Sequence, residues 1–156
     1  MADREALIIR PAAAVDLGGV LALYAQPEID NGRVLPLDEA ERMLQKFARY
    51  PDYTLYVAER EARIVGSFAL LIMDNIGHLG APSAIAEDVV VEPQSHGTGI
   101  GRQMMRFAMQ EARNKGCYKL MLSSNARRER AHAFYEALGF ERHGFSFRVE
   151  LDRVPA

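Results

Sequence analysis

The sequence predicts an α/β fold in which a mixed central β-sheet carries helices on both faces. Segments with strand patterns alternate with segments whose apolar residues recur at helical spacing, in the order β-α-α-β-β-β-α-β-α-β. The late strand–helix–strand run predicts two neighbouring parallel strands joined by a helix. At 156 residues, the chain fits a single domain over residues 1–156.

The first half of the chain predicts one strand, two helices and a hairpin. Pro11 ends the first strand and Pro51 ends the second helix. Asp16 stands where an N-cap of the first helix is expected. The predicted elements are strand 7–10, helix 15–24, helix 37–50 and the hairpin strands 53–59 and 64–73.

The second half of the chain alternates strictly between strand and helix patterns. Gly116 and Gly139 stand where the two helices should end. The last segment alternates apolar and polar residues and predicts a final strand. The predicted elements are strand 84–92, helix 99–115, strand 118–123, helix 128–138 and strand 145–151.

Composition excludes several classes of protein. A net charge of −2 and a pI near 6.1 argue against a dedicated nucleic-acid binder. No apolar stretch approaches the roughly 20 residues that cross a bilayer, so no membrane partner is expected. The N-terminal residues lack an apolar signal core, and the single Cys suits a reducing compartment, so a cytoplasmic location is expected. No group of residues has metal-ligand spacing.

A glycine-rich segment at residues 94–102 carries the strongest functional signal. Gly97, Gly99 and Gly101 alternate between an apolar strand and a helix start. Such glycines let a ligand approach the backbone, and unpaired amides at a helix start attract phosphate. Arg102 adds a positive charge. The spacing fits neither a Walker loop nor a dinucleotide fingerprint, so it predicts only a phosphate site.

Two motifs at these positions resemble the GNAT family of N-acetyltransferases. The first is His96-Gly-Thr-Gly-Ile-Gly101, in which His96 replaces the usual Arg or Gln, and the second is Asn125 followed by residues 131–140. The resemblance covers nearly the whole chain and implies acetyl-CoA as co-substrate, without a metal. It assigns the diphosphate to His96, Gly97, Thr98, Gly99, Ile100, Gly101 and Arg102, with Asn125 and His132 flanking the coenzyme.

The resemblance also implies roles for the strand before the loop. Its free backbone groups, at Val89 and Val91, bind the pantetheine arm, and the amide of Val90 or Val91 stabilises the oxyanion. Glu87, and after it Asp88, is the candidate general base or substrate ligand. Strand alternation places these two carboxylates on opposite faces of the sheet, and the alternative role is a structural ion pair with an Arg.

Tyr135 matches the position where the family usually has a Tyr that protonates the departing thiolate. The alternative is that Tyr135 only completes an apolar helix stripe. Asn125 is equally open to a helix-capping role. His78 is a candidate for the substrate pocket or a solvated loop residue, and Cys117 reads as a structural thiol.

The acceptor is expected to be a small primary amine. Residues 87–91 with 116–119 are similar to glucosamine-6-phosphate N-acetyltransferases, and residues 124–128 with 131–135 and 145–147 to aminoalkylphosphonate N-acetyltransferases. Both acceptors carry a phosphorus oxyanion, for which the candidate counter-charges are Arg127, Arg128, Arg142 and Arg148. A protein N-acetyltransferase or a non-catalytic acyl-CoA-binding regulator remains the alternative. The resemblance also allows a homodimer.

Overall fold

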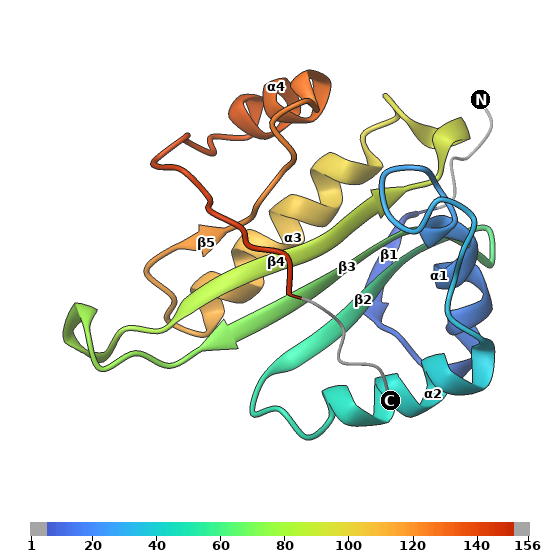
Figure 1. Cartoon of the computed structure of the whole chain (residues 1–156), viewed down its shortest axis with the longest axis horizontal. Coiled ribbons are helices and arrows are strands. Elements are labelled where there is room, and N and C mark those ends of the chain that lie inside the picture. The colour runs from blue at the N-terminus through green and yellow to red at the C-terminus, as the bar shows by residue number, and fades with distance from the viewer. Residues whose placement is uncertain (1–5, 152–156) are drawn as a thin grey trace. The chain divides into compact units, whose positions relative to one another are not determined.

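The computed structural model describes residues 6–151, which fall into two compact units divided between Leu122 and Ser123 (Figure 1). The first unit holds the whole sheet with three helices. The second holds helix α4 (Glu129–Ala137) and the irregular chain that follows it.

The sheet of the first unit is mixed, as the sequence predicts. Its strands lie in the order β1-β2-β3-β4-β5, and all neighbours are antiparallel except β4 and β5, which are parallel. The helix between those two strands makes the predicted β-α-β unit. The strands are β1 (Ile8–Pro11), β2 (Tyr53–Arg60), β3 (Arg63–Met73), β4 (Ser83–Val91) and β5 (Leu120–Met121).

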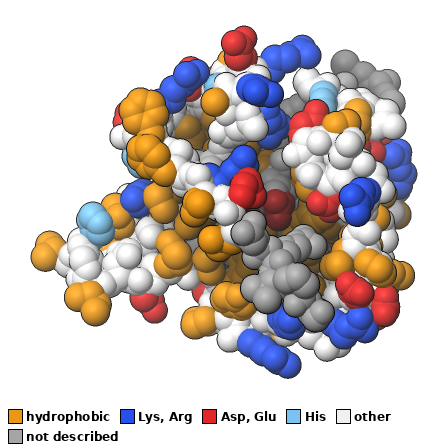
Figure 2. Space-filling model, viewed as in Figure 1, with side chains coloured by type: hydrophobic (Ala, Val, Ile, Leu, Met, Phe, Trp, Pro, Cys, Tyr) orange, Lys and Arg blue, Asp and Glu red, His pale blue; other side chains and the backbone are white. Residues whose placement is uncertain are grey.

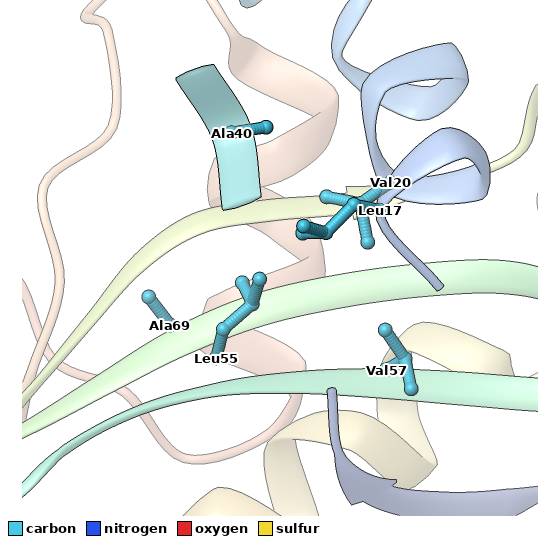
Figure 3. Packing of buried hydrophobic residues seen from close by; sticks show 6 residues of the cluster. All are labelled: Leu17, Val20, Ala40, Leu55, Val57 and Ala69. Carbon is cyan, nitrogen blue, oxygen red and sulfur yellow. The ribbon is translucent and has the colours of Figure 1, made fainter. Parts of the chain in front are cut away.

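Helices cover both faces of this sheet. On one face, α1 (Leu17–Tyr24) and α2 (Leu37–Phe47) pack on β2 and β3. Figure 3 shows the apolar cluster that joins them, made by Leu17, Val20, Ala40, Leu55, Val57 and Ala69. On the other face, α3 (Ile100–Asn114) brings Phe107 to within 5.1 Å of Tyr56, ring centre to ring centre. Two apolar layers therefore hold the sheet between them.

The start of α1 differs from its prediction. A short 3₁₀ turn, η1 (Ala14–Asp16), precedes the helix, and Asp16 makes no side-chain bond to the helix amides. Its carboxylate instead accepts hydrogen bonds from the Ala13 amide and from Arg10. Asp16 is therefore part of a buried ion pair and not a helix cap.

The predicted final strand at 145–151 is not formed in the structure. Phe145 and Phe147 are each 92% exposed, and no strand is assigned among the residues of the second unit that the structure describes. A strand needs a neighbouring edge for its backbone hydrogen bonds, and an alternating pattern specifies only which side chains share a face. Strand 118–123 likewise shortens to the two residues of β5.

The hairpin that joins β3 to β4 carries an exposed apolar tip. It contains the turn η2 (His78–Gly80), in which His78 and Leu79 have positive φ angles of 53° and 56°. Ile76 and Leu79 are fully exposed there, and Figure 2 shows hydrophobic side chains gathered at this projection. The His78 ring stacks on Tyr118, with 4.4 Å between ring centres. No helix among residues 6–151 is long and apolar enough to span a bilayer.

Candidate active site

The glycine-rich segment forms a tight connection between β4 and α3. After the turn η3 (Pro93–Ser95), Gly97 and Gly99 adopt φ angles of 77° and 90°, which glycine reaches without strain. Gly99 is the residue from which α3 starts. The amides of Ile100, Gly101 and Arg102 form the first turn of α3 and have no acceptor within the helix. Aligned amides at a helix start make an environment that attracts anions.

Side-chain hydrogen bonds within the glycine-rich segment stabilise its conformation. The Thr98 hydroxyl donates to the Ser95 carbonyl at 2.6 Å, and the Ser95 hydroxyl donates to a Glu92 carboxylate oxygen at 2.7 Å. Arg63 pairs with that same carboxylate at 2.7 Å. His96, the residue that departs from the family motif, places its ring Nε2 3.0 Å from the Val91 carbonyl oxygen. The segment is therefore held by its own polar groups, while Arg102 is exposed.

A hollow of about 460 Å³ lies beside the start of this segment. Its walls come from α1 and the residues just after it, the start of β3 and the residues that follow β4. The lining residues that carry polar side chains are Gln26, Arg63, Glu92 and Gln94.

Beyond its first residues, β4 has an open edge. It pairs with β5 only at Ala84 and Ile85, whereas it pairs with β3 as far as Val91. The Glu92 amide donates to the Val65 carbonyl at 2.9 Å, so Glu92 faces β3. Backbone groups alternate between the two edges of a strand. The backbone groups of Val89 and Val91 therefore point to the open edge, and those of Val90 point to β3.

A β-bulge in β4 interrupts the regular strand alternation beside Glu87. Val90 pairs with Ser67 and Glu87 with Ala69, so three steps along β4 match two along β3. Asp88 occupies the bulge with a φ of 50°. Because the bulge interrupts the alternation, strand periodicity no longer fixes the face on which the two carboxylates lie.

Two observations locate that face. Glu87 pairs with Ala69, which belongs to the cluster under α1 and α2. Burial raises the pKa of Tyr53, which packs against that cluster, and the charges of Asp88 and then Glu87 raise it further. Glu87 therefore lies on the side covered by α1 and α2, and both carboxylates raise the pKa of Tyr53 on that side.

The two carboxylates also have raised pKa values. Both residues are exposed at the surface, and partial loss of hydration is the main cause for Glu87, to which the neighbouring charge of Asp88 adds. Partial loss of hydration likewise raises the pKa of Asp88, followed by the charge of Asp30 in the loop after α1. No Arg or Lys lowers either value, so the alternative of a structural ion pair finds no partner among the described residues. Carboxyl groups with raised pKa values are suited to proton transfer.

Sequence reasoning missed three residues that surround this pair. Asp30 was visible only as part of a loop, and Tyr24 and Tyr53 only as members of apolar patterns. Burial raises the pKa of Tyr24, and the charge of Asp88 raises it further. The available signal was an acidic side chain, Asp30, in the connection between the predicted helices 15–24 and 37–50.

The second unit positions Asn125, His132 and Tyr135. The Asn125 side-chain oxygen accepts from the Arg127 amide at 2.9 Å, and its backbone carbonyl lies 2.8 Å from His132 Nε2. Asn125 thus shapes the turn before α4, whose N-cap is Arg128. Tyr135 packs edge-on against Phe134 and Phe140, and burial raises its pKa despite the opposing charge of Arg128. Its phenol therefore keeps its proton to a higher pH than an ordinary tyrosine.

The remaining candidates fall into different environments. Arg142 pairs with Glu136, and Arg148 pairs with Glu150 at 3.0 Å. Arg127 and Arg128 have no carboxylate within 4.0 Å among the described residues. Burial raises the pKa of the Cys117 thiol, which disfavours a reactive thiolate. Residues 6–151 contain no cluster of three or more His, Cys, Asp or Glu side chains able to hold a metal ion.

Comparisons with known proteins agree with this geometry. Residues 21–140 match the model of the acetyltransferase (GNAT) family. A glucosamine 6-phosphate N-acetyltransferase from Trypanosoma brucei brucei is 39% identical over 89 residues, which cover 57% of this chain and 58% of that protein. An aminoalkylphosphonate N-acetyltransferase from Salmonella typhimurium strain LT2 is 33% identical over 101 residues, 65% of each chain. The matches thus span less than two thirds of these two relatives.

Solved structures extend the likeness to nearly the whole chain. A transcriptional regulator from Bacillus halodurans C-125 superposes with a TM-score of 0.86 at 25% identity, covering 94% of this chain and 100% of that one.

Proposed function

Since the chain belongs to the acetyltransferase (GNAT) family, we propose that it transfers an acetyl group from acetyl-CoA directly to a small primary amine in a ternary complex. The observation that carries this proposal is the open edge of β4, which runs from the carboxylate pair at Glu87 and Asp88 to the glycine-rich segment before α3. An extended coenzyme arm fits such an edge, and its diphosphate fits the helix start.

The residues present fit the coenzyme. The first-turn amides of α3, with those of Gly97 and Gly99, would hold the diphosphate, and Arg102 would add a charge-assisted contact. The backbone groups of Val89 would hold the pantetheine arm at the open edge, next to the Val91 amide. Of the two oxyanion donors considered, the geometry favours the Val91 amide, because Val90 faces β3. Acetyl-CoA itself supplies the acetyl thioester.

Two groups of the chain would move the protons. The amine must lose a proton to attack, and Glu87, with Asp88 as the second choice, would accept it directly or through water. Their raised pKa values suit that task. The amine nitrogen then bonds to the acetyl carbon, the carbon–sulfur bond breaks, and the sulfur takes a proton from the Tyr135 phenol. The extra proton on the attacking nitrogen is released as the amide forms, and it restores the phenol. Its raised pKa keeps that phenol protonated at neutral pH.

The acceptor we propose is an amine that bears a phosphate or phosphonate. The two relatives named above act on glucosamine 6-phosphate and aminoalkylphosphonate. On this chain, Arg127 and Arg128 are the candidates for the oxyanion, because Arg142 and Arg148 already pair with glutamates. Asp30, Glu87 and Asp88 would face the ammonium group. Composition supports a cytoplasmic location, and a homodimer is a further proposal.

A thiol-release assay with purified protein and acetyl-CoA tests this function. The panel should pair aminophosphonates and amino sugar phosphates with their phosphorus-free amines, and add polyamines, amino acids and an amine-bearing peptide. We expect release with small amines and higher kcat/KM for the phosphorylated members. Release with the peptide alone would select a protein acetyltransferase.

A non-catalytic regulator is the second candidate, because the Bacillus halodurans structure is described as a transcriptional regulator. CoA binding without thiol release from any amine would select it and reject the enzyme.

A further inference from the structure

A single backbone carbonyl in the first unit receives two side chains from separate parts of the chain. The Gln26 Nε2 donates to the Val91 carbonyl oxygen at 3.1 Å, and the His96 Nε2 lies 3.0 Å from the same atom. A backbone carbonyl has two lone pairs, and these contacts use both. Because a carbonyl only accepts, the hydrogen of the neutral His96 ring must lie on Nε2. Both lone pairs of the Val91 carbonyl are therefore used within the chain, whereas the Val91 amide points to the open edge of β4.

His96 connects this carbonyl to the glycine-rich segment. It lies between η3 and Gly97, and its own amide donates to the Pro93 carbonyl at 3.2 Å. The side-chain bond to Val91 closes the segment back onto the end of β4. The conformation of the helix start and the position of the Val91 carbonyl thus depend on each other.

Gln26 connects the same carbonyl to the turn that follows α1. Its backbone carbonyl accepts hydrogen bonds from the amides of Ile29 and Asn31, each at 3.1 Å. Gln26 is therefore the first residue of the turn over residues 26–32 and holds it through these two bonds. Asp30 lies in that turn, with its amide bonded to the Tyr24 carbonyl at 2.9 Å. The Asp30 charge acts on Asp88, one of the two candidate bases. The Gln26 side chain therefore links the end of β4 to the turn that contains Asp30.

We propose that Gln26 is a positioning residue that couples coenzyme binding to the order of the acceptor turn, residues 26–32. Coenzyme bound at residues 94–102 fixes the Val91 carbonyl through His96, and that carbonyl holds Gln26 and the turn behind it. The inference rests on the proposed coenzyme site. Gln26 lies 65 positions before Val91 in the sequence, and His96 lies five positions after it. The two side chains are joined because both bond to the Val91 carbonyl oxygen.

Amide hydrogen exchange of the full chain, with and without CoA, tests the coupling without knowledge of the acceptor. In the wild-type protein, CoA should slow exchange in both 94–102 and 26–32, by about fivefold or more in the turn. Gln26→Met keeps the length of the side chain and removes the donor. In this variant CoA should protect 94–102 and leave 26–32 unchanged. Gln45→Met, on the exposed face of α2, is the matched control and should behave as wild type.

Variants at His96 test the second hydrogen bond to the Val91 carbonyl. His96→Gln keeps an N–H donor and should retain the response of the turn, whereas His96→Ala should lose it even at a CoA concentration that saturates the variant. Protection of 94–102 alone in the wild type would overturn the coupling. So would a turn that responds in Gln26→Met as in wild type, or one that exchanges faster with CoA. Absence of CoA protection at 94–102 in the wild type would instead reject the proposed coenzyme site.

Discussion

Arg10 holds Asp16 through two hydrogen bonds, from Nη1 to Oδ2 at 2.7 Å and from Nη2 to Oδ1 at 2.9 Å. The Asp16 side chain is only 5% exposed, and Arg10 also pairs with Glu59 on β2 at 2.6 Å. This ion pair joins β1, the start of α1 and β2. The hydrogen bonds from Arg10 keep the pKa of Asp16 below its ordinary value.

Asp16→Ala should lower the free energy of unfolding by about 2 kcal/mol. Removing one partner of a fully buried pair costs about 3–5 kcal/mol, but Arg10 remains 35% exposed and can regain water. Because the pKa of Asp16 is lowered in the folded state, its contribution is present above the ordinary Asp pKa and is lost as pH falls through the folded value. Urea unfolding from pH 7 down to pH 3 measures both effects. Asp38→Ala, which breaks an exposed pair with Arg42, should change stability by less than about 0.5 kcal/mol.

Gly99→Ala should weaken CoA binding through the backbone alone. The φ of 90° at Gly99 is strained for alanine by roughly 1–2 kcal/mol, and a methyl group there meets nothing within 4 Å. Relief of this strain would turn the first amides of α3, raising the Kd for CoA by about tenfold. Gly77→Ala is the control, since Gly77 has equally open surroundings and a φ of −63°. Equal CoA affinities in calorimetry for wild type and Gly99→Ala would argue against the helix start as the diphosphate site.

Glu87→Gln should lower kcat by about 10²–10⁴-fold if Glu87 is the general base. The base must be ionised, and partial loss of hydration raises the pKa of Glu87, so wild-type kcat/KM should rise with pH through a value above that of an ordinary glutamate. The variant should lose this limb of the pH profile. Glu39→Gln, in the exposed first turn of α2, should keep both rate and profile. A limb that persists in Glu87→Gln would shift the role to Asp88.

Asp88→Asn should raise the free energy of unfolding slightly at neutral pH, because Asp88 is exposed and solvent screens most of the cost of its charge. A carboxyl group with a raised folded pKa favours folding when protonated, and that contribution is lost as pH rises through the folded value. Asparagine tolerates the positive φ at this position. Urea unfolding at pH 7 should therefore show a gain that shrinks at pH 4. A loss of stability at pH 7 would mean that the Asp88 carboxylate makes a favourable contact when ionised.

Tyr135→Phe should lower kcat by about 10²-fold or more and leave the KM for acetyl-CoA nearly unchanged, if the phenol protonates the thiolate. The ring packing against Phe134 and Phe140 is kept, so unfolding should change little. Tyr50→Phe removes a hydroxyl from an exposed ring and serves as control. A variant with wild-type kcat would leave Tyr135 with the packing role alone.

Local patterns were sufficient for most of the fold. The hairpin of β2 and β3 and the helix α3 follow from short-range apolar periodicity and from turn residues, and both formed as predicted. The segment 145–151 did not, because its alternating pattern contains no information about a partner edge. The role of Asp16 was misread for a similar reason. An aspartate directly before a helix can serve either as the N-cap or as one partner of a buried ion pair, and the local sequence is the same in both cases.

The candidate site was predictable in its residues and not in its geometry. The glycine spacing identified the segment before α3. The bulge at Asp88 could not be predicted, because it is a shift in the pairing of β4 with β3 and the sequence of β4 alone does not mark it. Gln26 was missed because its partner, Val91, is 65 residues away in the chain. Contacts of that kind depend on how the sheet and α1 meet, which no window of sequence contains.

The left-handed backbone of Asp88 also limits the variation that position 88 can accept. At a φ of 50°, aspartate, asparagine and glycine are tolerated, whereas β-branched and bulky residues are strongly disfavoured. A mutational library that randomises residues 87 and 88 should therefore return a broad range of folded variants at 87 and a narrow one at 88. Efforts to retune the acceptor preference should begin at Asp30, which has no positive φ angle and is not a candidate base.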